Sequence, residues 1–518
     1  MLLETRELSF TYPNNTTPAL CGVSLSVREG EFVTLCGASG CGKSTLLRLL
    51  KPALAPRGKL GGAVFFGGEE LSALSERSAA REIGFVAQNP EAQLVTDRVW
   101  HELAFSLESV GAPSGEIRRR VAECAEYFGL ERLFESETAS LSGGEKQLVA
   151  LASVMALKPR LLLLDEPTSQ LDPIAAREFI DTAVRLSREL GIAVLIAEHR
   201  LEELLPVSDR AVVMDDGRII ADCKPEELLR SLPEGHRMRE ALPAAARIFA
   251  LSGERGITPL SVREGRANAA VRAYLTAHCP EERPLPKLSE KPVISAKELW
   301  VSYGKDKPDA LKNASVSLFG GEIYALLGGN GSGKTTLLKT LYGMVKALGG
   351  RIVGKNARMA FLPQNPAALF AEESVLAELC RVLPEEQARG QLLRFGISEE
   401  LFSRDPLDLS GGEQQRAALA LLLAQNLEVL LLDEPTKGLD AFAKRSLSQL
   451  LRGAADSGCA VLAVTHDTEF AALCADRCGL LFNGEVVSEA KPAEFFSDNF
   501  FYTTPLCRLS KGIAEGWF

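Results

Sequence analysis

The chain has 518 residues, enough for two or three domains that each bury a core of their own. Its composition is that of an ordinary globular protein, with 46% hydrophobic and 24% charged residues, and its formal net charge is −10. An acidic balance argues against a protein that coats nucleic acid, since phosphate contacts need clustered lysines and arginines. We therefore expect no nucleic-acid partner.

Eleven cysteines are spread along the chain, and no secretory leader precedes Phe10. This pattern predicts reduced thiols in a cytoplasm rather than a disulfide framework. No Cys-x-x-Cys or Cys/His pair has the spacing of a metal site, and we expect Cys474 and Cys478 to be neighbours on one helix.

No stretch is apolar for long enough to predict a transmembrane helix. A membrane span needs about 20 nearly uninterrupted apolar residues. The two most apolar stretches, 148–164 and 417–432, carry charged or polar residues within them. Each predicts a helix, a turn and then a buried parallel strand. We therefore expect a soluble protein, so that any membrane role would come through a partner.

The first chemical motif follows two strand-like stretches. Alternating apolar residues end at Tyr12, and the apolar run 32–36 predicts a buried strand. That run leads into a G-x4-G-K-S loop, and residues 45–50 then predict a helix. The flanking strand and helix disfavour a glycine-rich turn that happens to end in Lys-Ser. The loop residues are Gly37, Ala38, Ser39, Gly40, Cys41, Gly42, Lys43 and Ser44.

This loop has the chemistry of a phosphate-binding loop. Its glycines let backbone amides approach phosphate, Lys43 reaches the β and γ oxygens, and Ser44 offers a ligand to Mg²⁺. We expect Cys41 to have a lowered pKa because of its place in the loop, but no catalytic role.

Further along, the pattern alternates between strands and helices. We predict strands at 61–66 and 83–87, a break at Gln88, and helices at 99–109 and 116–128. Leu141-Ser142-Gly143-Gly144 then opens another helix. A serine and two glycines before helix formers predict a helix start with free backbone N–H groups, which attracts phosphate.

Two adjacent carboxylates follow the predicted buried strand 161–164. Such residues at the carboxyl edge of a parallel sheet suit a nucleotide site. Asp165 can hold Mg²⁺, and Glu166 can polarise an attacking water. His199 follows the next strand, 193–197, and we interpret it as a γ-phosphate contact rather than a structural histidine.

The stretch from 225 to 292 differs from what precedes it. It predicts helices at 226–232, 238–251 and 263–278, and then a stiff extended connector at Pro280, Pro284, Pro286 and Pro292. We divide the chain into a first domain over 1–230, a connector over 231–292 and a second domain over 293–518.

The motifs then recur in the same order. The difference in residue number between matching positions is 291 at the first tyrosine (303 − 12) and at the loop lysine (334 − 43). It falls to 276 at the glutamine (364 − 88), to 268 at the serine of Leu-Ser-Gly-Gly (410 − 142) and to 267 at the histidine (466 − 199). The chain is therefore a tandem duplication in which the stretch from serine to histidine is almost invariant in length and the larger length differences lie outside it. The repeated loop is Gly328, Gly329, Asn330, Gly331, Ser332, Gly333, Lys334 and Thr335.

The repeated Leu-Ser-Gly-Gly-Glu, placed before Asp-Glu, resembles the signature motif of the ATP-binding cassette (ABC) ATPases. Both halves of the chain resemble ABC ATPase domains over nearly their whole length. The resemblance implies an α/β fold of tandem P-loop NTPase domains. Each would have a RecA-like parallel-sheet core, an antiparallel β subdomain and an inserted helical subdomain. It also implies that two cassettes pack head to tail and bury two ATP molecules with Mg²⁺.

The resemblance also implies the residues of two composite, hydrolytically competent sites. The first comprises Lys43, Ser44, Gln88, Asp165, Glu166 and His199, capped by Ser410 and Gly412. The second comprises Lys334, Thr335, Gln364, Asp433, Glu434 and His466, capped by Ser142 and Gly144. ATP contacts extend to Thr45 and Thr336, and Mg²⁺ ligands would be Ser44, Gln88 and Asp165 in the first site and Thr335, Gln364 and Asp433 in the second. Tyr12 and Tyr303 match the aromatic residue that stacks on adenine, with an ordinary core or edge tyrosine as the alternative.

Within that family, Gln88-Asn89-Pro90-x-x-Gln93 of the first half resembles a stretch of the energy-coupling factor (ECF) transporter ATPases. The 198–203 stretch and the tail 502–505 also resemble the fused two-cassette members of that family, although Leu369 replaces the second glutamine in the second half. The resemblance implies a peripheral protein on the cytoplasmic face of the membrane. Its partners would be a transmembrane coupling protein and a small substrate-binding membrane subunit for a vitamin or metal ion.

Two other functions fit a twin-cassette protein. The ATPase of a sugar importer usually has a degraded second loop and signature, whereas both are intact here. A soluble ABC-type translation factor tends to carry a long basic linker, whereas this linker is mixed in charge and rich in proline. The transported solute stays open.

Overall fold

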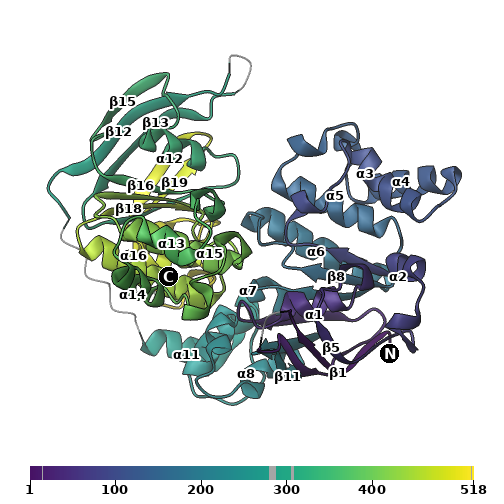
Figure 1. The fold of residues 1–518 in the computed structure, drawn as a ribbon. Coiled ribbons are helices and arrows are strands. Elements are labelled where there is room, and N and C mark those ends of the chain that lie inside the picture. The colour runs from purple at the N-terminus through teal and green to yellow at the C-terminus, as the bar shows by residue number, and fades with distance from the viewer. Residues whose placement is uncertain (14–15, 279–287, 305–307, 515, 518) are drawn as a thin grey trace. The chain divides into compact units, whose positions relative to one another are not determined.

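The computed structural model describes residues 1–13, 16–278, 288–304, 308–514 and 516–517. The chain forms two compact units, Met1–Gly265 and Arg266–Phe518, which we describe one at a time (Figure 1). Pro280, Pro284 and Pro286 of the predicted connector lie outside the described residues, and Pro292 begins a strand.

The first unit is built on a six-stranded, mostly parallel sheet with the order β11-β10-β4-β9-β8-β7. Its central strands are apolar at nearly every position and buried on both faces, as expected for a parallel sheet covered by helices. Asp165 pairs with Ala197, so the residues that follow both strands leave the sheet at the same edge. The strands are β4 (Phe32–Gly37), β7 (Ile83–Val86), β8 (Leu161–Asp165), β9 (Ala193–Ala197), β10 (Arg210–Asp215) and the antiparallel β11 (Arg218–Cys223).

An antiparallel sheet forms the β subdomain of this unit. Apolar residues of its long strands alternate with exposed ones, so one face is buried on a core shared with the parallel sheet. The strands are β1 (Leu3–Thr11), β2 (Leu20–Val23), β3 (Ser26–Val27), β5 (Lys59–Phe66) and β6 (Glu69–Glu70).

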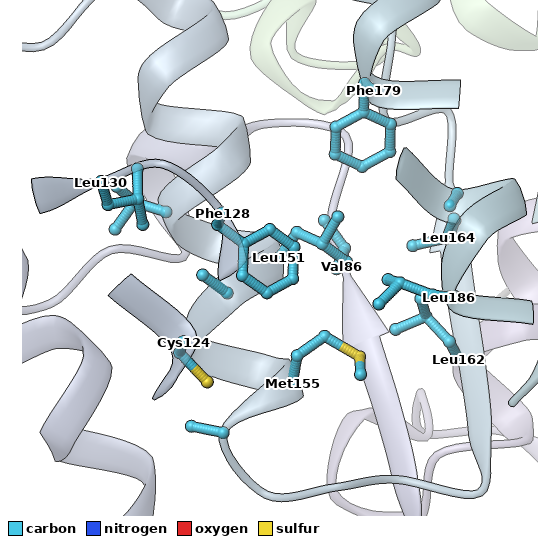
Figure 2. Close-up of a cluster of buried hydrophobic side chains, with 14 of the residues drawn as sticks. Val86, Cys124, Phe128, Leu130, Leu151, Met155, Leu162, Leu164, Phe179 and Leu186 are labelled. Carbon is cyan, nitrogen blue, oxygen red and sulfur yellow. The ribbon is translucent and has the colours of Figure 1, made fainter. Parts of the chain in front are cut away.

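Helices cover the parallel sheet and form the inserted subdomain. Figure 2 shows the core between them, in which Phe128 and Leu151 lie near Val86 at the sheet edge and Phe179 comes from another helix. The predicted helix at 99–109 is confirmed, and the one at 116–128 forms two residues earlier and ends one residue earlier. The helices are α1 (Lys43–Leu49), α2 (Glu76–Glu82), α3 (Val99–Ser109), α4 (Ser114–Tyr127), α5 (Gly143–Met155), α6 (Pro173–Leu190) and α7 (Leu201–Leu204).

The helices after the antiparallel pair β10 and β11 are shorter than predicted. The expected helix 238–251 is a 3-10 turn at Arg237–Ala241 and then α9 (Ala244–Leu251), because Pro243 cannot donate a helical hydrogen bond. The expected helix 263–278 is α10 (Val262–Ala267) and α11 (Ala269–Ala277), because the side chain of Asn268 caps a new helix start. Residues 226–232 form a 3-10 turn and α8 (Leu228–Ser231).

The second unit repeats the plan with sheets ordered β16-β17-β18-β14-β19-β20 and β13-β12-β15. Its strands are β12 (Pro292–Val301), β13 (Leu311–Phe319), β14 (Ile323–Leu327), β15 (Gly349–Val353), β16 (Met359–Leu362), β17 (Val429–Asp433), β18 (Ala460–Thr465), β19 (Arg477–Phe482) and β20 (Glu485–Ala490). Its helices after α11 are α12 (Lys334–Tyr342), α13 (Val375–Cys380), α14 (Glu385–Arg394), α15 (Gly411–Leu423), α16 (Ala441–Asp456), α17 (Thr468–Cys474), α18 (Pro492–Asp498) and α19 (Pro505–Ser510).

Two further observations bear on the sequence predictions. Cys474 and Cys478 do not share a helix: Cys474 ends α17, whereas Cys478 lies on β19, because the chain turns at Ala475 into a buried strand. Within the described ranges, no helix combines the length and the apolar character needed to cross a membrane.

Candidate functional site

The phosphate loop of the first unit connects β4 to α1 and is folded around its own lysine. The ammonium of Lys43 is buried and donates to the carbonyl oxygens of Gly37 at 2.9 Å and Ala38 at 3.1 Å. Gly42 has a φ of 104°, and a Cβ there would meet the carbonyl oxygen of Ala19 at 2.7 Å. Only glycine fits this position, which lets the loop curl before the helix begins. Lys334 makes the same contacts with Gly328 and Gly329.

A hydroxyl and a carboxylate meet beside each loop. The hydroxyl of Ser44 donates to Oδ1 of Asp165 at 2.8 Å, and that of Thr335 donates to Oδ1 of Asp433 at 3.0 Å. Burial raises the pKa of Asp165 to about 6, against the hydrogen bond from Ser44, and it also raises the pKa of Asp433. Each pair presents hard oxygen ligands, the kind that Mg²⁺ takes in proteins.

Glu166 follows this carboxylate in the first unit and is held from two sides. The amide nitrogen of Gln88 donates to Oε2 at 2.8 Å, and Nε2 of His199 lies 2.9 Å from Oε1. The backbone of Glu166 has a φ of 45°, a left-handed conformation that is uncommon for residues other than glycine. Its N–H donates to Ala197 on β9, which fixes this turn at the strand edge. The structure therefore brings together three residues that lie far apart in the sequence.

Glu434 of the second unit has the same backbone strain, with a φ of 50°, but different partners. The ammonium of Lys334 lies 3.4 Å from Oε1, and the backbone N–H of His466 donates to Oε2 at 3.3 Å. The ring Nδ1 of His466 lies 3.0 Å from Oε2 without the alignment of a hydrogen bond. Burial would raise the pKa of Glu434, but the closeness of His466 and Lys334 lowers it overall.

The predicted glutamines are placed differently in the two units. Gln88 contacts Glu166 directly, whereas no hydrogen bond joins Gln364 to Glu434 in the described part of the second unit. Both glutamines are exposed and end the stretch that follows the edge strand.

The two tyrosines stand beside their own phosphate loops. The hydroxyl of Tyr12 lies 3.0 Å from Oγ1 of Thr45, and that of Tyr303 lies 3.2 Å from Oγ1 of Thr336. Tyr303 is 55% exposed, so its ring is open to a planar ligand. Adenine stacking on these rings stays a prediction.

The signature serines begin α5 and α15. The side chain of Ser142 accepts from the N–H of Glu145 while Glu145 accepts from the N–H of Ser142, and Ser410 and Glu413 repeat this capping box. One of the N–H groups expected to be free is thus used by the serine itself, whereas Gly144 and Gly412 lie within the first turn.

The expectation for Cys41 is wrong. Its thiol is 4% exposed, and burial raises its pKa even though the charge of Lys43 opposes that shift. The loop turns this side chain inward, toward Gly37, rather than toward the ligand.

Sequence reasoning assigned no supporting role to several residues that hold these groups in place. Gln93 folds back on the edge strand, accepting from the N–H of Ala87 at 2.8 Å and donating to the carbonyl oxygen of Phe85 at 3.1 Å. Glu198 is 2% exposed and binds the turn after Glu166.

A second missed pair is Glu102 and Glu378. Both are buried on the first helix after the glutamine and accept backbone N–H groups of the preceding loop. Their shift of 276 (378 − 102) equals that of Gln88 and Gln364, so the repeat itself contained the signal.

Known proteins resemble this chain over both units. A family model described as ABC transporter matches residues 20–169 and 311–437. A putative ABC transporter ATP-binding protein of Bacillus anthracis is 40% identical, covering 98% of this chain and 95% of that protein. One of Streptomyces avermitilis is 36% identical, covering 95% and 94%.

Among solved structures, an archaeal ribosome recycling factor, in complex with a ribosomal stalk protein, matches with a TM-score of 0.60. The match covers 94% of this chain and 90% of that one at 23% sequence identity. At this identity the likeness concerns the fold alone.

Proposed function

The chain belongs to the ABC transporter family and is an ATPase with two cassettes, and from that premise we propose that it powers an importer of the energy-coupling factor type. Its cargo would be a vitamin or a metal ion. The observation that carries the ATPase chemistry is the arrangement of Ser44, Asp165, Glu166 and His199 at one sheet edge, with counterparts in the second unit.

Each ATP site would combine the phosphate loop, base and histidine of one unit with the signature residues of the other. Lys43 and Lys334 would bind the β- and γ-phosphates, and Tyr12 and Tyr303 would stack on adenine. Glu166 and Glu434 would orient the attacking water and accept its proton, with His199 and His466 contacting the γ-phosphate. Ser410 and Gly412 would cap the first site and Ser142 and Gly144 the second, so that each nucleotide is shared by both cassettes.

Mg²⁺ fits the hydroxyl and carboxylate pairs described above. Ser44 and Asp165 would hold it in the first site and Thr335 and Asp433 in the second, with the side-chain oxygens of Gln88 and Gln364 as further ligands. When bound, the ion neutralises charge that develops on the transferred phosphoryl group. The hydroxyls of Ser44 and Thr335 donate to the carboxylates of Asp165 and Asp433, which orients both side chains of each pair.

The importer type is supported by the loop that follows Gln88. Gln93 ties this loop to β7, so the Gln-Asn-Pro-x-x-Gln sequence that resembles energy-coupling ATPases forms a compact turn. Lys146 on α5 pairs with Glu91 in the same turn at 2.6 Å. The turn therefore links the glutamine that contacts Glu166 to the signature helix, as a coupling element would require.

The partner proteins would supply the membrane-spanning part. We expect a transmembrane coupling protein and a small substrate-binding subunit, with this chain peripheral on the cytoplasmic face of the membrane. The intact second loop and signature favour this function over the ATPase of a sugar importer.

An affinity pull-down from gently solubilised membranes tests the proposal. Mass spectrometry should identify a coupling membrane protein together with a small, very hydrophobic subunit. Recovery of ribosomes without a membrane protein would overturn the transport function and leave the ATPase.

A further inference from the structure

Glu198 is a buried carboxylate that has no part in the ATP sites proposed above. It directly precedes His199 and is 2% exposed. Its Oε1 accepts from the N–H of Thr168 at 2.8 Å and from the hydroxyl of the same residue at 2.5 Å. Its Oε2 accepts from the backbone N–H of His199 at 2.9 Å. Burying a carboxylate is costly, and these three donors are what makes it tolerable here.

The partners of Glu198 are parts of the proposed site. Thr168 lies in the turn two residues beyond Glu166, and His199 contacts Glu166 through its ring. The contacts therefore close a ring that runs from Glu166 through its own turn to Thr168, across to Glu198, and back through His199. A ring of this kind sets the distance between the two side chains that act on water and γ-phosphate.

The second unit holds its histidine in another way. Thr465 stands where Glu198 stands, and its hydroxyl accepts from the N–H of Asp467 at 3.0 Å. The backbone N–H of His466 is bound by Glu434 itself. Asp467 caps α17 and pairs with Lys444 at 2.6 Å, which anchors the far side of that loop.

We propose that Glu198 is a positioning residue of the first ATP site, which holds the backbone of His199 so that its ring stays aligned with Glu166. The inference rests on the roles proposed above for Glu166 and His199. The two sites would then differ in the residue that binds the backbone N–H of the histidine. In the second site this residue is the proposed base, Glu434, whereas in the first site it is Glu198.

The sharpest test is Glu198→Gln in a chain whose second site is silenced by Glu434→Gln. Glutamine keeps the volume and one acceptor for Thr168, but its amide nitrogen cannot accept from the N–H of His199. We expect kcat of the remaining site to fall about tenfold or more, since small misplacements of catalytic groups cost rate steeply. KM for ATP should change little.

A second readout is hydrogen exchange measured by mass spectrometry in the absence of ATP. Peptides spanning His199 should exchange faster in Glu198→Gln and stay protected in Glu166→Gln. Peptides spanning His466 should instead exchange faster in Glu434→Gln. Glu322→Gln provides a matched control, because Glu322 is as buried as Glu198 but pairs with Arg477 away from both sites.

The outcomes separate this inference from the proposed function. Full activity of Glu198→Gln, with Glu166→Gln inactive in the same background, would overturn the positioning role alone. Activity that survives Glu166→Gln would overturn the assignment of the base, and the inference with it. If Glu198→Gln does not fold, Thr168→Val removes one donor of the ring and should give a smaller fall in kcat, whereas unchanged kcat would count against the inference.

Discussion

The two cassettes share the motifs of the proposed ATP sites, yet they hold the glutamates proposed as bases differently. In the first, Glu166 contacts Gln88 and His199, and Glu198 takes the backbone of the histidine. In the second, Glu434 contacts Lys334 and the backbone of His466. The two units keep the same residue types at the proposed reacting positions but differ in the residues that contact them. Equal motifs therefore do not imply equal sites.

The loops after the two glutamines differ in the same way. Gln93 ties the first loop to β7, whereas Leu369 stands at that place in the second and packs against a hydrophobic core. Lys146 pairs with Glu91 in the first unit, whereas Gln414 donates to the carbonyl oxygens of Pro406 and Leu407 in the second. A loop held by polar side chains in the first unit thus corresponds, in the second unit, to a loop whose Leu369 packs against the core.

The largest expected effect tests what the cassettes have in common. Replacing both glutamates, by Glu166→Gln with Glu434→Gln, should lower steady-state ATP turnover by roughly 10²–10⁴-fold, the range that a general base contributes. ATP binding should persist, because the phosphate loops are unchanged. Phosphate release and nucleotide binding would be measured on the same preparation, and undiminished turnover would refute both bases.

The next prediction tests the difference between the glutamines. Gln88→Ala removes a donor to Glu166, whereas Gln364→Ala removes no such contact. Since a hydrogen bond to a charged group contributes about 1.5–3 kcal/mol, we expect Gln88→Ala to slow the first site about tenfold. Each variant would be assayed with the opposite glutamate replaced by glutamine. Equal losses of ATP turnover in Gln88→Ala and Gln364→Ala would mean that the contact between Gln88 and Glu166 does not affect the rate.

A smaller effect is expected where the loops differ. Gln93→Leu gives the first loop the residue of the second and removes two hydrogen bonds to β7. We expect faster hydrogen exchange over residues 85–93 and a reduced yield of membrane partners in the pull-down, with ATP turnover lowered less than by Gln88→Ala. Leu369→Met in the second unit is the control, because it conserves an apolar side chain. Unchanged exchange in Gln93→Leu would rule out an anchoring role.

The smallest effect concerns Lys51, which corresponds to Tyr342 in the second unit. Its ammonium donates to the carbonyl oxygens of Ala79, Ala80 and Ile83, and burial lowers its pKa to about 8 from 10.5. Between these values the unfolded chain binds more protons than the folded one, so the free energy of unfolding should rise with pH from about 8 to 10.5.

Urea unfolding across that pH window checks this sign. The wild type should gain stability relative to Lys51→Met as the pH rises. A difference between wild type and Lys51→Met that is constant with pH would show that Lys51 titrates normally.

Local sequence determined much of this protein. The strand before each phosphate loop, the glycine that begins each following helix and the serine caps of α5 and α15 were all predictable, because the causes are local: hydrophobic period, φ preference and capping chemistry. Errors arose where a proline or an asparagine within an apolar run ended a helix, as at Pro243 and Asn268.

Only the tertiary structure decided how the proposed catalytic groups are held. Glu166, Gln88 and His199 are brought together by the order of strands in the sheet, and no spacing in the sequence shows that order. The burial that raises the pKa of Cys41 comes from a loop that turns inward, and two of the three donors that stabilise Glu198 belong to Thr168, 30 residues earlier in the chain. Burial, and the choice of side chains that contact each motif residue, are properties of the packed fold. The motifs therefore determined which chemical groups are present, and the packing decided which residues hold those groups in each cassette.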